Sequence, residues 1–271
     1  MSVPRHSPPP NYAREFGVAG NRVVLVGEIL AGGTAWRPHA EKLAVNWRVT
    51  TVTPVVTLEA ADGHTPRPGW TIADEARVLQ SFLDEAGMEK VHLGGWSLGG
   101  AIALEVATAI PERIASLTLV EAQAWWVMRA LRLEPLGYEQ LVRAFERFNI
   151  ADVDEESLIA FLQMVGAVED RDDPREMRGW RLAVANRQAI PFSQTVVNTQ
   201  GDTATLAKLA MPVLLSGGDA SQPFDQAITE GLARLIPHAE RLTLPGNHTS
   251  HLTNLGAFLD RFERFLTQAR F

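Results

Sequence analysis

Short runs of β-branched and apolar residues alternate along the chain with longer amphipathic stretches. The run 22–26 stops at Gly27 and the run 48–53 stops before Pro54, which is typical of buried strands. The stretches 34–45 and 71–86 carry apolar residues at helical spacing. The predicted strands are 22–26, 48–53, 90–93, 115–120, 212–216 and 240–244, and the predicted helices are 34–45, 71–86, 98–110 and 228–235. This alternation predicts an α/β fold with a mainly parallel sheet covered by helices on both faces.

One long segment, 122–206, breaks this alternation. It holds helical patterns at 139–148, 155–165 and 174–186, and no convincing strand pattern. We therefore predict a helical cap inserted at 122–206, an α/β core made of 21–121 and 207–271, and an N-terminal arm at 1–20.

Composition narrows the possible functions. The 271 residues carry a formal charge of −7, which argues against a nucleic-acid partner. There is no cysteine, so a disulfide scaffold, a thiolate metal site and thiol catalysis are all excluded. Residues 1–10 are rich in proline without an apolar run, and no later apolar run reaches the ~18 residues that span a bilayer. We expect a cytoplasmic protein with no membrane association.

The clearest chemical motif is Gly95-Trp96-Ser97-Leu98-Gly99, which stands between a predicted strand and a predicted helix. A serine on such a sharp turn exposes its hydroxyl above the sheet, and glycines two residues before and after it remove clashing Cβ atoms. The alternative without a chemical role is a glycine-rich turn that lets the helix pack closely on the sheet. A dinucleotide fingerprint fits worse, because the glycine spacing differs from G-x-G-x-x-G. The pattern favours Ser97 as a nucleophile.

A serine hydroxyl needs a general base and a carboxylate that orients the base. Of seven histidines, His248 follows the last predicted strand, where a loop can reach the carboxyl edge of the sheet. His251 is the alternative, and the two could form a metal pair, although no third ligand is evident. Asp219 follows the strand 212–216 and is the preferred carboxylate, with Glu121 and Asp225 as competitors.

The chain resembles the α/β-hydrolase superfamily from about residue 23 to residue 265. The resemblance rests on the serine motif, on Met211-Pro212-Val213-Leu214-Leu215-Ser216-Gly217-Gly218-Asp219 and on Pro245-Gly246-Asn247-His248. It implies a triad of Ser97, Asp219 and His248, in the chain order of that fold. It also implies an oxyanion hole made by the backbone N–H groups of Leu98 and Glu28. Many relatives have His-Gly where this chain has Val26-Gly27, and the short N-terminus leaves room for at most one antiparallel strand before the first core strand.

Four tryptophans suggest an apolar substrate pocket: Trp36, Trp96, Trp125 and Trp126. Packing in the core or cap is the alternative role for each. No motif indicates a cofactor or a metal ion. We therefore expect a cofactor-independent serine hydrolase acting on an apolar carboxylic ester, lactone or thioester. The alternatives are a carbon–carbon bond hydrolase or perhydrolase of the same fold, and a non-catalytic protein that binds small molecules.

Overall fold

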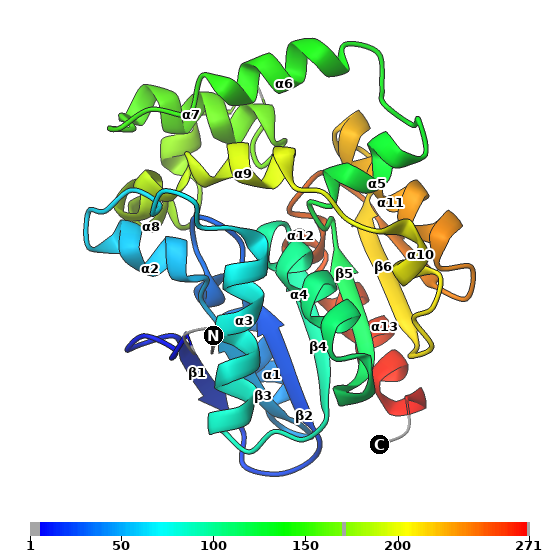
Figure 1. Cartoon of the computed structure of the whole chain (residues 1–271). Coiled ribbons are helices and arrows are strands. Elements are labelled where there is room, and N and C mark those ends of the chain that lie inside the picture. Colours follow the sequence, from blue (N-terminus) through cyan, green and yellow to red (C-terminus); the bar gives the residue numbers. More distant parts are fainter. Residues whose placement is uncertain (1–5, 170–171, 270–271) are drawn as a thin grey trace, which may run out of the picture.

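A seven-stranded sheet runs through the part of the chain that the computed structural model describes, residues 6–169 and 172–269 (Figure 1). The strand order is β1-β3-β2-β4-β5-β6-β7. All pairings are parallel except that of β1 with β3, which is antiparallel. The strands are β1 (Ala13–Phe16), β2 (Arg22–Val26), β3 (Arg48–Val52), β4 (Val91–Trp96), β5 (Ile114–Val120), β6 (Val213–Gly218) and β7 (Glu240–Leu244). The sequence leaves room for at most one antiparallel strand before the first core strand, and the structure has one there, β1.

Helices cover both faces of this sheet, as predicted. One layer contains α2 (Val55–Ala61), α3 (Ile72–Glu85), α4 (Leu98–Ala109) and α11 (Pro223–Leu235), and the other contains α1 (Arg37–Leu43) and α13 (Leu255–Gln268) (Figure 1). Strand β2 shows why its sequence is apolar throughout. Val24 and Val26 pack into the core under the first layer, whereas Val23 and Leu25 pack into the core under the second.

Several elements differ from the sequence prediction. Strand β4 continues through Gly94 to Trp96, beyond the predicted end at residue 93, because a close approach of Leu25 favours glycine there. The predicted helix 34–45 divides into a 3₁₀ turn and α1, which begins near Pro38. The prediction missed α2, α13, α12 (Ser250–Thr253) and β1. Strand β1 lies inside the predicted arm, of which residues 1–5 are outside the described residues.

Helices connect β5 to β6, and all but the last of them lie above the carboxyl ends of the strands (Figure 1). They are α5 (Trp125–Ala130), α6 (Tyr138–Glu146), α7 (Glu155–Met164), α8 (Trp180–Asn186), α9 (Phe192–Asn198) and α10 (Thr203–Leu206). Within 122–169 and 172–206 the structure has no strand. The predicted helix 174–186 is a short 3₁₀ turn followed by α8, separated by Gly179 at a φ of 105°. No helix among the described residues is long and apolar enough to cross a membrane.

Candidate active site

Ser97 lies on a strained turn between β4 and α4. Its φ of 55° and ψ of −118° are conformations that non-glycine residues rarely adopt. A Cβ on Gly95 would lie 2.1 Å from the Gly99 carbonyl oxygen, and a Cβ on Gly99 would lie 2.2 Å from that of Val26. The Ser97 N–H donates to the Val120 carbonyl at 3.0 Å, which holds the turn against β5. The two glycines are therefore needed for the turn that presents Ser97.

The two predicted oxyanion donors belong to Leu98, the first residue of α4, and to Glu28, just after β2. Within the described residues the Leu98 N–H has no acceptor, whereas Glu28 forms an antiparallel backbone bridge with Gly32. Their strands are neighbours, since Val26 pairs with Gly95. The backbone at Gly27 also lies against Gly99, because a Cβ there would be 2.5 Å from the Gly27 carbonyl oxygen. The elbow and the loop after β2 thus place both predicted donors at the same edge of the sheet.

The Glu28 side chain closes its own loop. Its carboxylate accepts hydrogen bonds from the Leu30 N–H at 2.7 Å and from the Ala31 N–H, while its carbonyl accepts from Gly32 at 3.1 Å. Burial raises the pKa of the Glu28 carboxyl, and the two backbone hydrogen bonds and the nearby His248 oppose that rise. With Val26 in place of the histidine that many relatives have before Gly27, the loop after β2 is still held by internal hydrogen bonds. It also places the Glu28 carboxyl group near His248.

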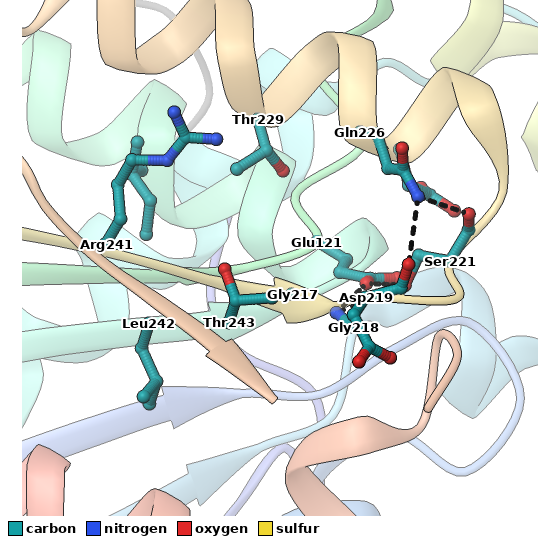
Figure 2. Close-up of a pocket in the computed structure, with 12 residues that line it drawn as sticks. Glu121, Gly217, Gly218, Asp219, Ser221, Gln226, Thr229, Arg241, Leu242 and Thr243 are labelled. Atoms are coloured by element: carbon teal, nitrogen blue, oxygen red, sulfur yellow. Dashed lines mark hydrogen bonds between the residues drawn. The ribbon is translucent and has the colours of Figure 1, made fainter. Parts of the chain in front are cut away.

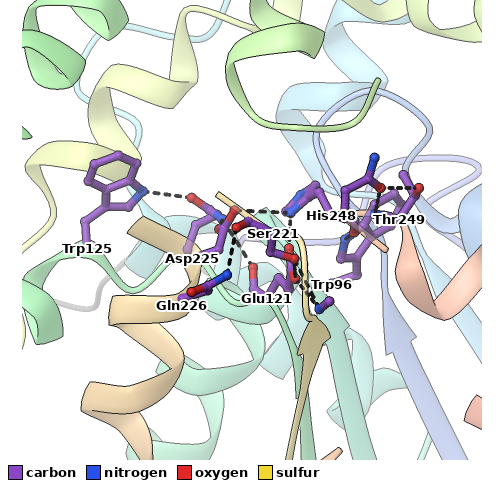
Figure 3. Close-up of polar contacts among 11 residues, drawn as sticks. Trp96, Glu121, Trp125, Ser221, Asp225, Gln226, His248 and Thr249 are labelled. Carbon is purple, nitrogen blue, oxygen red and sulfur yellow. Dashed lines mark hydrogen bonds and ion pairs between the residues drawn. The ribbon is translucent and has the colours of Figure 1, made fainter. Parts of the chain in front are cut away.

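His248 lies in the loop after β7 and is buried. The indole N–H of Trp96, next to Ser97, donates to the His248 carbonyl at 3.1 Å. The Nδ1 atom of His248 lies 2.6 Å from Oε2 of Glu121 (Figure 3). The structure thus fastens the histidine loop to the elbow and pairs its imidazole with a carboxylate.

That carboxylate is a competitor of Asp219 in the sequence prediction. Glu121 directly follows β5, the strand between β4 and β6, and it is buried. Its Oε1 atom accepts from the Gly218 N–H at 2.8 Å and from the Ser221 hydroxyl, which leaves Oε2 for His248. The signal in the sequence is the position of Glu121, at the end of the strand next to the elbow strand.

The prediction that Asp219 contacts His248 is wrong. The Asp219 carboxylate is exposed and accepts from the Gly246 N–H at 2.8 Å, so it closes the turn after β7 instead. Strand β6 extends through Gly217 and Gly218, which places Asp219 at the start of the loop, where it pairs with backbone after β7. Figure 2 shows Asp219 beside a crevice between β6, β7 and α11; neither Ser97 nor His248 lines this crevice.

Asp225, the other competitor, also faces His248. Its Oδ2 atom lies 3.7 Å from His248 Nδ1 and has no hydrogen bond, while Oδ1 accepts from the Gln123 amide at 2.7 Å (Figure 3). The residue is buried on α11. His248 therefore has one carboxylate at hydrogen-bond distance and a second one farther away.

The pKa values of these two carboxyl groups shift in opposite directions. Burial raises the pKa of Glu121, but hydrogen bonds from His248, Ser221 and Gly218 outweigh it, so its pKa lies below the ordinary value. Burial and the charge of Glu121 raise the pKa of Asp225 to about 8. Burial opposes the charged form of His248, yet its pKa is raised by the Glu121 hydrogen bond and by the surrounding carboxylates. Of the two, Glu121 is therefore the carboxylate whose ionised form is favoured beside the imidazole, whereas burial and the charge of Glu121 favour the protonated form of Asp225.

His251, the alternative base, lies in the core. It is fully buried among Trp36, His39 and Phe258, and burial lowers its pKa well below the ordinary value. It does not form a metal pair with His248. The ligand atoms of Glu121, Asp225 and His248 do lie within 4.8 Å of one another. At 2.6 Å, however, the atoms of Glu121 and His248 already form a hydrogen bond, which fits a catalytic pair better than a metal site.

A small apolar cavity of about 30 Å³, partly open to solvent, is lined by Ser97. Of the four predicted tryptophans, Trp125 lines it. Trp36 and Trp96 are buried in the core under α1 and α13, and Trp126 lines a separate crevice near Gly201. The other lining residues come from the elbow, the loop after β2 and the helices above the sheet: Ile29, Leu98, Gln123, Phe145, Phe161, Val165, Ser193, Val196 and Val197.

Proteins of similar sequence are named as hydrolases. A pimeloyl-[acyl-carrier protein] methyl ester esterase of Aliivibrio salmonicida is 24% identical over 261 residues, 91% of this chain and 92% of the relative. RutD of Azorhizobium caulinodans, named as a carbamate hydrolase, is 36% identical over 110 residues, which span 41% of this chain and 40% of that protein.

Solved structures give the same fold. A hydrolase from Pseudomonas aeruginosa PA01 superposes with a TM-score of 0.75 at 23% identity, covering 94% of this chain and 93% of the other. An enol-lactonase from Burkholderia xenovorans LB400 gives a TM-score of 0.66 at 19% identity, with coverage of 94% and 95%. The family model described as the alpha/beta hydrolase fold matches residues 59–255, well over half of the chain. By its sequence as well as by its architecture, this chain belongs to the alpha/beta hydrolase fold family.

Proposed function

We propose that this protein is a serine hydrolase that cleaves a small, apolar carboxylic ester, lactone or thioester, with Ser97 as nucleophile, His248 as general base and Glu121 as the orienting carboxylate. The observation that carries this proposal is the buried pair of His248 Nδ1 and Glu121 Oε2 at 2.6 Å, fastened through Trp96 to the turn that presents Ser97. Glu121 replaces Asp219 in the predicted triad, because Asp219 is occupied elsewhere.

Acylation follows from these positions. Glu121 accepts a hydrogen bond from the Nδ1–H group of His248, which leaves Nε2 unprotonated and able to take the proton of the Ser97 hydroxyl. The Ser97 oxygen then bonds to the carbonyl carbon of the substrate. When the tetrahedral intermediate collapses, the bond to the alcohol or thiol breaks, and His248 returns the proton to the leaving group.

The Leu98 N–H, which has no acceptor within the described residues, supports this step, with the Glu28 backbone as the proposed second donor. Negative charge develops on the carbonyl oxygen of the substrate, and pre-positioned N–H donors stabilise it without reorganisation. Each donor of this kind is worth roughly 10²–10³ in rate in other hydrolases. The Glu28 carboxylate is held by its own loop, so the proposed role belongs to its backbone.

In deacylation, water is the attacking group and Ser97 is the leaving group. A water molecule gives a proton to His248 and attacks the acyl carbon, and the bond to Ser97 breaks with return of the proton to the serine. The products are the carboxylic acid and free enzyme. No cofactor takes part in this scheme.

The cavity supports an apolar substrate of modest size. Its lining is mainly aromatic and aliphatic, with Trp125 stacked on Phe224 at a ring distance of 4.8 Å. We propose that the segment 122–206 acts as the cap that shapes this cavity. The relatives named above act on a methyl ester, a carbamate and an enol-lactone, as their names state, which is consistent with acyl transfer to water.

The test compares wild type with Ser97→Ala on short p-nitrophenyl esters, together with labelling by a fluorophosphonate probe. We expect turnover and labelling in wild type and neither in the variant. Asp219→Asn serves as the matched control for a triad residue and should keep both. Absence of Ser97-dependent turnover and of labelling would favour the alternative of a non-catalytic binding protein.

A further inference from the structure

The loop after β2, residues 27–32, carries the proposed second donor of the oxyanion hole, the Glu28 N–H. The start of the loop is fixed on the sheet, because the Gly27 N–H donates to a carbonyl oxygen of β3 at 2.9 Å. Farther along the loop, the carbonyl oxygens of Ile29 and Leu30 accept hydrogen bonds from two side chains that lie outside it. These two side chains therefore bear on where the Glu28 N–H lies.

One of the two side chains is Asn186, the last residue of α8. Its amide Nδ2 donates to the Leu30 carbonyl at 2.5 Å, and the residue is 4% exposed. Its Oδ1 atom has no hydrogen bond among residues 6–169 and 172–269. An apolar side chain of the same size would lose one hydrogen bond but would also remove a buried oxygen without a partner. Folding stability alone therefore gives a weak reason for an asparagine here.

The other side chain is Thr57 on α2, a buried residue whose hydroxyl donates to the Ile29 carbonyl at 2.9 Å. Helices α2 and α8 contact each other, so neighbouring peptide groups of the loop are held by two helices that pack together (Figure 1). The Leu30 N–H is also bound, at 2.7 Å, by the Glu28 carboxylate. The backbone that follows Glu28 is thus fixed from three directions.

We propose that Asn186 is a positioning residue for the oxyanion hole: by holding the Leu30 carbonyl, it keeps the Glu28 N–H directed at the substrate oxygen on which negative charge develops. Thr57 supports the same loop from the second helix. This inference rests on the proposed hydrolase function. A hydrogen-bond donor stabilises a transition state only while it is held close to the productive position. Loss of the Asn186 hydrogen bond therefore weakens binding of the transition state and spares binding of the ground state.

The experiment compares wild type with Asn186→Leu, Asn186→Ala and Thr57→Val. The matched control is Gln188→Leu. Gln188 is also buried, two residues farther along the chain, but its amide bonds to Asp152 and Val153 instead of the loop. The control thus removes a buried amide from the same region and leaves the loop after β2 untouched.

The readouts separate the transition state from the ground state. One is kcat/KM on p-nitrophenyl acetate. The second is the inhibition constant of trifluoromethyl butyl ketone: the Ser97 oxygen bonds to its carbonyl carbon, His248 takes the serine proton, and the ketone oxygen becomes an oxyanion. The third is the inhibition constant of the matching alcohol, which has the same carbon chain and forms no oxyanion. Circular dichroism and thermal unfolding verify the fold of each variant.

We expect Asn186→Leu and Asn186→Ala to lower kcat/KM about ten- to a hundredfold, because a misplaced donor loses up to about the effect of a donor removed. The inhibition constant of the ketone should rise by a similar factor, and that of the alcohol should stay within about twofold. Thr57→Val should act in the same direction, by about threefold or more. Gln188→Leu should stay within about threefold of wild type in all three readouts.

Several results would overturn the proposal. Wild-type kcat/KM and ketone inhibition in both Asn186 variants would show that the hole does not depend on this residue. Equal losses for ketone and alcohol, equal losses in Gln188→Leu, or failure of both Asn186 variants to fold would show a structural role instead. If wild type has no Ser97-dependent turnover and the fluorophosphonate probe does not label Ser97, the proposed function fails and this inference fails with it; normal turnover without an effect of Asn186 overturns the inference alone.

Discussion

Glu121→Gln tests the carboxylate assignment, because the structure dictates how the new amide must lie. In wild type, Oε1 accepts from the Gly218 N–H at 2.8 Å and Oε2 faces His248 Nδ1 at 2.6 Å. The Gly218 N–H can only donate, so the glutamine oxygen must face it, and the amide NH₂ must face Nδ1. Nδ1 then becomes an acceptor and the ring proton moves to Nε2, which can no longer accept the proton of Ser97.

The expected loss has two parts. A hydrogen bond to a charged group contributes about 1.5–3 kcal/mol, and each 1.36 kcal/mol is tenfold, so loss of the bond that stabilises the imidazolium alone lowers the rate about 10- to 150-fold. The wrong tautomer adds to this, and in a serine protease the equivalent change of carboxylate to amide lowers kcat about 10⁴-fold. We expect kcat to fall about 10²- to 10⁴-fold. Asp225 limits the loss, because its Oδ2 atom lies 3.7 Å from Nδ1 and has no other partner.

The assay measures kcat on a p-nitrophenyl ester and the rate of fluorophosphonate labelling of Ser97, with circular dichroism and thermal unfolding to verify the fold. Asp225→Asn is expected to lower kcat about tenfold or less, because no direct hydrogen bond is lost. The double variant Glu121→Gln with Asp225→Asn should be less active than either single variant. Asp219→Asn should stay within about threefold of wild type, since its carboxylate contacts only an exposed turn.

The reverse pattern would refute the assignment. If Asp219→Asn lost as much activity as expected for Glu121→Gln, while Glu121→Gln stayed near wild type with its fold intact, then Asp219 would be the partner of His248 in the working enzyme. Equal and full losses for Glu121→Gln and Asp225→Asn would mean instead that both carboxylates are required.

Three further changes test the surrounding geometry. Gly99→Ala should abolish Ser97 labelling or folding, because its Cβ would lie 2.2 Å from the Val26 carbonyl oxygen; labelling at the normal rate with an unchanged melting temperature would contradict this. Trp96→Phe removes the 3.1 Å bond to the His248 carbonyl and should lower kcat about tenfold with little change in KM, as steady-state kinetics on the same ester would show. Glu28→Gln removes a negative charge that raises the pKa of His248; since the neutral imidazole is the active base and activity rises with pH through that pKa, the acid limb of the kcat/KM profile should move to lower pH, and a shift to higher pH would disprove the effect.

The sequence by itself determined the fold class and the glycine-flanked turn at Ser97, because both depend on local patterns. The apolar period of β2 and the helical period of α3 are fixed by neighbouring residues, and the turn has no room for a Cβ at residues 95 and 99. His248 also followed from its position after the last strand. Strand β1 was missed because its four residues pair with β3, a contact made far away in the chain.

Tertiary structure alone decided the carboxylate and the cavity. Glu121, Asp219 and Asp225 all stand near the carboxyl ends of strands, and the sequence cannot say which one faces Nδ1. The extension of β6 by two glycines directs Asp219 to the turn at Gly246 and leaves Glu121, from the neighbouring strand, at 2.6 Å from the imidazole. In the same way, Trp125 reaches the cavity and Trp36 the core because burial depends on which layer each helix covers, and chain order does not contain that information.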